Sequence, residues 1–123
     1  MINVAETLFG FAALALLMFS ATMTLAHRTL LVTSCCMSYT SLVLLLGCMS
    51  APFTDTYMPL SLYLFLFNII AAAFYFTSAF YTLWKSGDDT FGKLAAVVAG
   101  LAGYSHYFHA KRCYIRVFSQ PEP

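Results

Sequence analysis

Four long apolar runs, separated by charged residues, dominate the pattern of this sequence. The uncharged intervals are those between Glu6 and Arg28, Arg28 and Asp55, Asp55 and Lys85, and Lys93 and Lys111. A helix needs about 17 to 25 apolar residues to cross the ~30 Å hydrocarbon core of a bilayer. The pattern therefore predicts an all-α, multi-pass integral membrane protein. Its four transmembrane helices are expected at residues 5–26, 28–50, 58–84 and 90–111.

Short polar segments connect the predicted helices and make helical hairpins of them. Between the third and fourth helices, Gly87 suits the left-handed position that ends a helix, and Asp88 and Asp89 suit the cap of the next one. Pro52 and Pro59 mark the second connection, because proline ends a helix or occupies its first turn. Both features predict closely spaced antiparallel helices.

The first connection contains no glycine or proline. We predict a tight turn centred on His27 and Arg28, because one unbroken helix would leave about twenty apolar residues outside the bilayer. A bend within one long helix is the alternative. Residues 112–123 are predicted to form a basic tail at the membrane surface. Lysines and arginines are equally frequent on the two sides of this topology, so the orientation stays open.

The composition agrees with a membrane location and limits the possible functions. Charged residues make up 9% of the chain, against about 25% in soluble domains, and 61% of the residues are hydrophobic. Connections this short leave no room for a water-soluble catalytic domain, so we expect a single transmembrane domain without enzymatic activity. A net charge of +1 without a long basic run gives no reason to expect nucleic-acid binding.

Polar side chains are rare near the middle of the predicted spans. Asn68 is the one strongly polar residue close to a span centre, while Glu6 lies near the end of its span. Proton and ion pathways need ionisable groups inside the membrane. The sequence therefore argues against a transport route within this chain, and we expect Asn68 to donate a hydrogen bond to a neighbouring helix.

Small residues recur along the fourth span at the spacing of helix-packing surfaces. Rows of this kind let helix backbones approach closely, as in small-xxx-small association. We predict two packing rows, one made of Gly92, Ala96 and Gly100 and the other of Ala95, Ala99 and Gly103.

Two histidines, His106 and His109, lie three residues apart near the end of the fourth span. We expect no partner for them inside the chain, because the third histidine falls at the opposite membrane surface in this topology. An interfacial position beside Lys111, Arg112 and Arg116 explains them, with anionic headgroups, including cardiolipin in a mitochondrial membrane, as ligands. No cofactor or metal is predicted, although a metal completed by a partner chain stays open.

The layout resembles the small four-span tethering proteins of ergosterol biosynthesis. Arg28 and Thr29 open the second span, and the fourth span ends in basic residues, as in that family. The aromatic-Gly-x-Trp run expected after the Arg-Thr pair is replaced here by Leu30, Leu31 and Val32. The resemblance implies a non-catalytic scaffold in the endoplasmic reticulum, and no functional residue is carried over from it.

These features favour a non-catalytic accessory subunit of a larger membrane complex, in contact with other subunits and phospholipids. The predicted host is an energy-transducing complex of the inner mitochondrial membrane. One alternative is an endoplasmic-reticulum scaffold that tethers membrane enzymes. The other is a small carrier or membrane enzyme, which would need a polar cavity near Asn68, Ser38 or Thr77.

Overall fold

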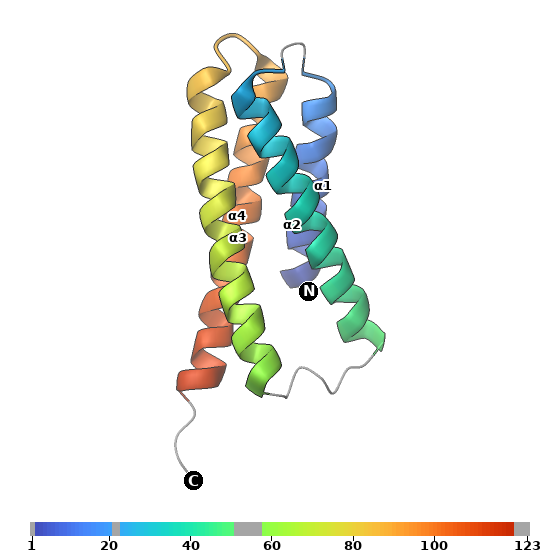
Figure 1. Cartoon of the computed structure of the whole chain (residues 1–123), viewed down its shortest axis with the longest axis vertical. Coiled ribbons are helices and arrows are strands. Elements are labelled where there is room, and N and C mark those ends of the chain that lie inside the picture. The colour runs from blue at the N-terminus through green and yellow to red at the C-terminus, as the bar shows by residue number, and fades with distance from the viewer. Residues whose placement is uncertain (1, 21–22, 51–57, 120–123) are drawn as a thin grey trace.

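The computed structural model describes residues 2–20, 23–50 and 58–119, and this part of the chain contains four α-helices and no strand. The helices are α1 (Ile2–Met18), α2 (Leu25–Ser50), α3 (Met58–Lys85) and α4 (Thr90–Phe118). They form an elongated antiparallel bundle in which α4 packs against both α3 and α1 (Figure 1). The all-α prediction is confirmed.

Two of the helices are long and apolar enough to cross a membrane, judged by length and composition. They are Leu25–Ser50, which is α2, and Ser61–Lys85, which is most of α3. The apolar helix α1 has 17 residues and spans about 26 Å, somewhat less than a ~30 Å hydrocarbon core. The helix α4 has 29 residues but is less apolar than α2 or α3.

The turn between α1 and α2 lies earlier in the chain than predicted. Helix α1 ends at Met18 and α2 begins at Leu25, so His27 and Arg28 belong to the first turn of α2, and the predicted turn at these two residues is wrong. Thr24 caps α2, because its Oγ1 accepts the backbone N–H of His27 at 3.4 Å. The hydroxyl residue Thr24 therefore indicates where α2 begins, whereas the spacing of charged residues does not.

The turn between α3 and α4 follows the prediction. Gly87 has a φ of 51° and is the second residue after the end of α3 at Lys85, and Asp89 has the extended backbone of a helix N-cap. Residues 112–118 of the predicted tail, by contrast, are helical, because α4 continues to Phe118; residues 120–123 lie outside the described part of the chain. The basic residues near the C-terminus therefore project from a regular helix.

The small residues of α4 form most of its buried face. Gly92, Ala95, Ala96, Ala99 and Gly103 are buried between the neighbouring helices. Gly100, which belongs to the same predicted row as Gly92 and Ala96, is only half-buried, and a Cβ atom added to it would meet no atom within 4 Å. The regular spacing of small residues along the sequence therefore did not show which of them have close neighbours in the bundle.

Large apolar side chains cover the outside of the bundle on all four helices. On α3 these exposed residues include Phe74, Phe76, Phe80 and Trp84. Several of the most polar side chains lie inside instead, among them Glu6, His27, Asn68 and His106, each at most 2% exposed. Large apolar side chains outside and buried polar ones inside are unusual for a water-soluble bundle, although the lysines and arginines are exposed here too.

Helix α1 lies directly against α2 and α3 at Gly10. A Cβ atom at this position would lie 1.9 Å from Ser38 Oγ and 2.7 Å from Tyr75 Oη. Glycine is therefore required by the contact between α1 and its neighbours.

We expect Gly10→Ala to lower the free energy of unfolding by roughly 1–2 kcal/mol, in the lower part of the usual range for overpacking because the Ser38 hydroxyl can rotate away. Thermal unfolding in mild detergent, followed by circular dichroism, measures the change. Adding Ser38→Ala should recover part of the loss. Gly47→Ala is the control, since a Cβ atom added there would meet none of the described neighbours within 4 Å, and an equal loss there would contradict the packing argument.

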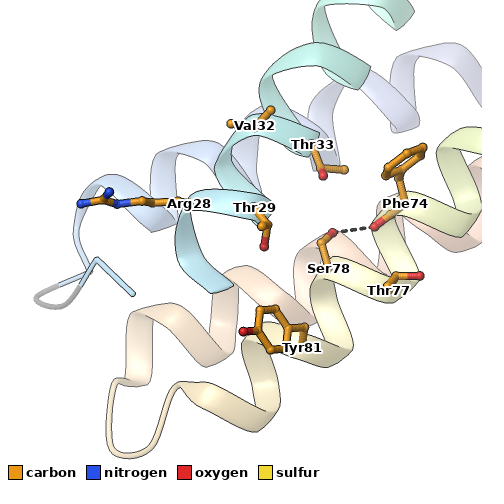
Figure 2. A pocket seen from close by; sticks show the side chains of 8 residues that line it. All are labelled: Arg28, Thr29, Val32, Thr33, Phe74, Thr77, Ser78 and Tyr81. Atoms are coloured by element: carbon orange, nitrogen blue, oxygen red, sulfur yellow. Dashed lines mark hydrogen bonds between the residues drawn. The ribbon is translucent and has the colours of Figure 1, made fainter. Parts of the chain in front are cut away.

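An open groove of about 510 Å³ runs between α2 and α3 (Figure 2). It starts near the beginning of α2 and extends along α3 from Tyr81 to Phe74. Its walls are almost entirely apolar.

Candidate functional site

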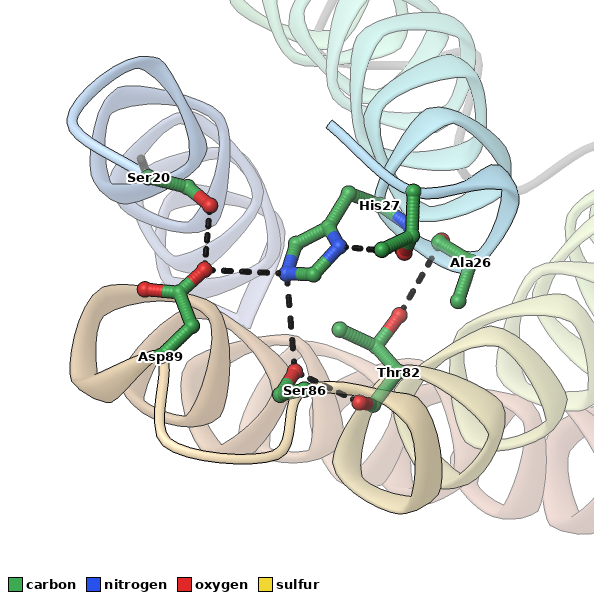
Figure 3. A network of polar contacts seen from close by, with 7 residues as sticks. Ser20, Ala26, His27, Thr82, Ser86 and Asp89 are labelled. Carbon is green, nitrogen blue, oxygen red and sulfur yellow. Dashed lines mark hydrogen bonds and ion pairs between the residues drawn. The ribbon is translucent and has the colours of Figure 1, made fainter. Parts of the chain in front are cut away.

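A polar cluster joins the ends of α1, α2, α3 and α4 at the Gly87 end of the bundle (Figure 3). We call it the turn cluster; its members are Ser20, Thr24, His27, Ser86 and Asp89. The His27 ring is completely buried, with Nδ1 2.6 Å from Thr24 Oγ1 and Nε2 3.2 Å from Asp89 Oδ2. The Ser20 hydroxyl donates to the same Asp89 oxygen, and Ser86 Oγ lies 3.5 Å from His27 Nε2.

These contacts fix the four helix ends relative to one another. Thr82 adds a direct link, because its Oγ1 donates to the backbone oxygen of Ala26 at 3.1 Å (Figure 3). The hydroxyl of Ser86 donates in turn to the Thr82 carbonyl at 2.6 Å. The turn cluster therefore links the helix ends through polar contacts at this end of the molecule.

The hydrogen bond from Ser20 lowers the pKa of Asp89 below its ordinary value of 3.8, and the nearby His27 acts in the same direction. A carboxylate whose pKa is lower in the folded state stabilises the fold above its ordinary pKa. That contribution is lost as the pH falls through the folded pKa.

We expect the unfolding temperature to decrease as the pH is lowered below about 4, and Asp89→Asn to reduce this dependence. Unfolding curves recorded over a pH series test this directly. Asp88→Asn serves as the matched control, because Asp88 is the exposed neighbour in the same turn. Equal pH profiles for the wild type and Asp89→Asn would show that the stability supplied by the turn cluster does not depend on this carboxylate.

A second polar cluster lies deep in the bundle, between α1, α3 and α4. We call it the mid-bundle cluster; its members are Glu6, Asn68, Tyr75, His106 and His109. The Glu6 carboxylate is 2% exposed and accepts a hydrogen bond from His109 Nδ1 at 2.9 Å, with His106 Nδ1 at 3.7 Å. The His106 ring stacks on Tyr75, with ring centroids 5.6 Å apart and an interplanar angle of 19°.

The hydrogen bonds assign a tautomer to His106. Asn68 Nδ2 donates to the Leu64 carbonyl at 2.8 Å, so Asn68 Oδ1 faces His106 and accepts from its Nδ1 at 2.7 Å. Nδ1 therefore carries the hydrogen, and Nε2 is a fully buried nitrogen that has no hydrogen-bond partner among the described residues. His106 lies about 24 Å along α4 from Thr90 at ~1.5 Å per residue, well inside the bundle.

These positions correct the prediction for the two histidines. His106 is 0% exposed and the His109 side chain is 15% exposed, so both face the bundle interior, and both have partners within the chain. The physical reason is that α1 brings Glu6 to the histidine face of α4, which no local pattern reveals. Lys111, Arg112 and Arg116 are exposed, and their contact with lipid headgroups stays a prediction.

The same geometry bears on two further expectations. Glu6 lies near the start of α1, as expected, and its side chain there is a buried carboxylate beside two imidazoles. Asn68 was expected to donate to a neighbouring helix. It accepts from α4 instead and donates within α3. Ionisable groups are therefore present inside the bundle.

Sequence reasoning missed two features of the clusters, namely Tyr75 and the pairing of His27 with Asp89. A signal existed, since a carboxylate or imidazole in an apolar run is costly unless it is paired. Among the described residues, no three His, Cys, Asp or Glu side chains are arranged to hold a metal ion.

Comparison with known proteins found no matching protein-family model and no similar sequence or structure among curated proteins and solved structures.

Proposed function

We propose that the chain is a four-span membrane protein and acts as a non-catalytic accessory subunit of a larger membrane complex. The observation that carries the proposal is the distribution of side chains: large apolar residues cover the outside, whereas Glu6, His27, Asn68 and His106 are buried inside. An apolar outer surface suits lipid and neighbouring helices, and a paired polar interior suits a bundle held together within lipid.

The second half of α2 supports contact with other subunits. None of residues 42–50 is buried, and this part of α2 slants away from α3 (Figure 1). About two turns of helix therefore project without close packing inside the chain. The aromatic side chains exposed on α3 offer a further irregular surface of the kind that fills gaps between subunits.

We place the host complex in the inner mitochondrial membrane as an energy-transducing assembly, by analogy with the small multi-span subunits such complexes collect. Lys111, Arg112 and Arg116 are exposed near the end of α4, where anionic headgroups such as those of cardiolipin would meet them. Arg112 also lies 5.0 Å from the Phe108 ring centroid, a contact that orients its guanidinium.

A small carrier or membrane enzyme is a second candidate, and one observation favours it. The mid-bundle cluster puts Glu6 in contact with His109 and close to His106, and ionisable groups within a membrane mark proton or substrate sites by default. In the accessory-subunit proposal, the same groups bond α1 to α4 and α3 to α4.

Extraction from the native membrane in a mild detergent, followed by a native gel and mass spectrometry, tests the proposal. We expect the chain in one assembly of fixed stoichiometry. Several unrelated enzyme partners would favour the tethering scaffold. A free monomer would contradict the subunit role, and the carrier candidate would then be tested with the Glu6→Gln variant in proteoliposomes.

A further inference from the structure

The groove between α2 and α3 is open to the outside of the bundle along its length. Along α3 it extends from Tyr81 to Phe74, which is about 11 Å at ~1.5 Å per residue. This length fits most of one leaflet, which is roughly 15 Å or half of a ~30 Å hydrocarbon core. Its volume of about 510 Å³ lies within the ~300–1,000 Å³ of small-molecule sites.

The groove wall is apolar although five of its residues carry hydroxyl groups. Three of these hydroxyls donate to carbonyl oxygens of their own helix: Thr29 to Ala26 at 2.8 Å, Thr77 to Ala73 at 2.8 Å and Ser78 to Phe74 at 2.6 Å. Their methyl and methylene groups are left to line the groove, beside Val32 and Phe74. The surface therefore suits a hydrocarbon chain.

One end of the groove carries a positive charge. Arg28 lies at the end where α2 begins, and Tyr81 lies at the same end on α3 (Figure 2). Arg28 is exposed, and among the residues that the structure describes it has no acidic partner. This end also holds the turn cluster and the Gly87 turn, so it is at the membrane surface in the proposed topology.

We propose that the α2–α3 groove binds one anionic phospholipid, with an acyl chain between α2 and α3 and the phosphate at Arg28. This inference rests on the proposed membrane location but not on the subunit role. Charge complementarity favours a lipid as the ligand. An apolar groove with a cation at its membrane-surface end is complementary to an anionic lipid and not to an uncharged helix. The site is distinct from the basic residues at the end of α4, which lie at the other end of the bundle (Figure 1).

Native mass spectrometry of the purified full chain in non-ionic detergent, mixed with equal amounts of phosphatidylglycerol and phosphatidylcholine, tests the site. We expect one phosphatidylglycerol to be retained preferentially. Arg28→Gln should reduce this preference about fivefold, the effect of one cation near a lipid headgroup. Val32→Trp, which fills the groove, should abolish retention of either lipid, and Thr77→Phe should do the same from the α3 wall. Circular dichroism confirms that each variant is folded.

Lys93→Gln is the matched control, because Lys93 is an exposed cation at the same end of the bundle but not in the groove, and it should leave retention unchanged. Unchanged retention in Arg28→Gln or in both groove-filling variants would overturn the inference. Displacement of the lipid by glycerol phosphate alone would also overturn it, because it would identify a phosphate site without an acyl chain. So would a dimer that Val32→Trp dissociates, since a second copy would then be the occupant.

The outcomes separate this inference from the proposed function. A complex subunit that binds both lipids equally contradicts only the lipid site. A monomer that retains phosphatidylglycerol contradicts only the subunit role.

Discussion

Glu6→Ala is expected to lower the free energy of unfolding by about 3–5 kcal/mol, the usual cost of removing one partner of a buried ion pair. Glu6 is 2% exposed and accepts from His109 Nδ1 at 2.9 Å, so its removal leaves a buried imidazole without its acceptor. Glu6→Gln retains an oxygen acceptor without the charge, and it should cost less, about 1.5–3 kcal/mol. Thermal unfolding in mild detergent gives both values.

Two further variants make this test specific. Asp88→Ala is the matched control, because Asp88 is an exposed carboxylate and should change stability by less than about 0.5 kcal/mol. Replacing Glu6 and His109 together by leucine should restore much of the loss, since an apolar pair often replaces a buried ion pair at little cost. If Glu6→Ala were as stable as Asp88→Ala, the mid-bundle cluster would not hold α1 in place.

Gly92→Ala and Gly100→Ala are expected to change stability in opposite directions, although both replace glycine by alanine within α4. A Cβ atom at Gly92 would lie 2.3 Å from His27 Nε2, 2.8 Å from Asp89 Oδ2 and 2.9 Å from Ser86 Oγ. We expect a loss of about 1–3 kcal/mol from this overpacking of the turn cluster. At Gly100, open space and the better helix propensity of alanine predict a gain of up to about 1 kcal/mol.

Unfolding curves of the two variants, measured side by side, test the geometry of the turn cluster. Each variant is the control for the other, because intrinsic helix propensity changes equally in both. The same sign of change at Gly92 and Gly100 would be the contradictory result. It would mean that His27 does not lie against α4 at Gly92.

Together the two clusters hold the short helix α1 in the bundle. Ser20, just beyond the end of α1, donates to Asp89 in the turn cluster, and Glu6 near its start bonds to His109 in the mid-bundle cluster. Between these points, Gly10 allows close contact with Ser38 and Tyr75. In the proposed membrane location an apolar helix gains little from burial, so polar contacts and close packing would determine the position of α1.

The sequence by itself determined the helical class, the approximate extent of α3 and the turn at Gly87. These depend on local properties: the spacing of charges, the left-handed conformation that glycine accepts, and the residues that cap a helix. The prediction from local sequence placed the first turn at His27 instead of before Leu25. It relied on the position of the charged residues and did not consider Thr24 as a helix cap.

Only the tertiary structure decided what the polar side chains contact. His106 is hydrogen-bonded to Asn68, which is 38 residues away in the sequence, and His109 to Glu6, which is 103 residues away. Neighbouring residues on a helix point about 100° apart, so the rotation of α4 about its own axis decides whether the two histidines face the bundle or the outer surface. The packing of α1 and α3 against the small residues of α4 fixes that rotation, and it thereby turns two expected surface histidines into the centre of a buried polar cluster.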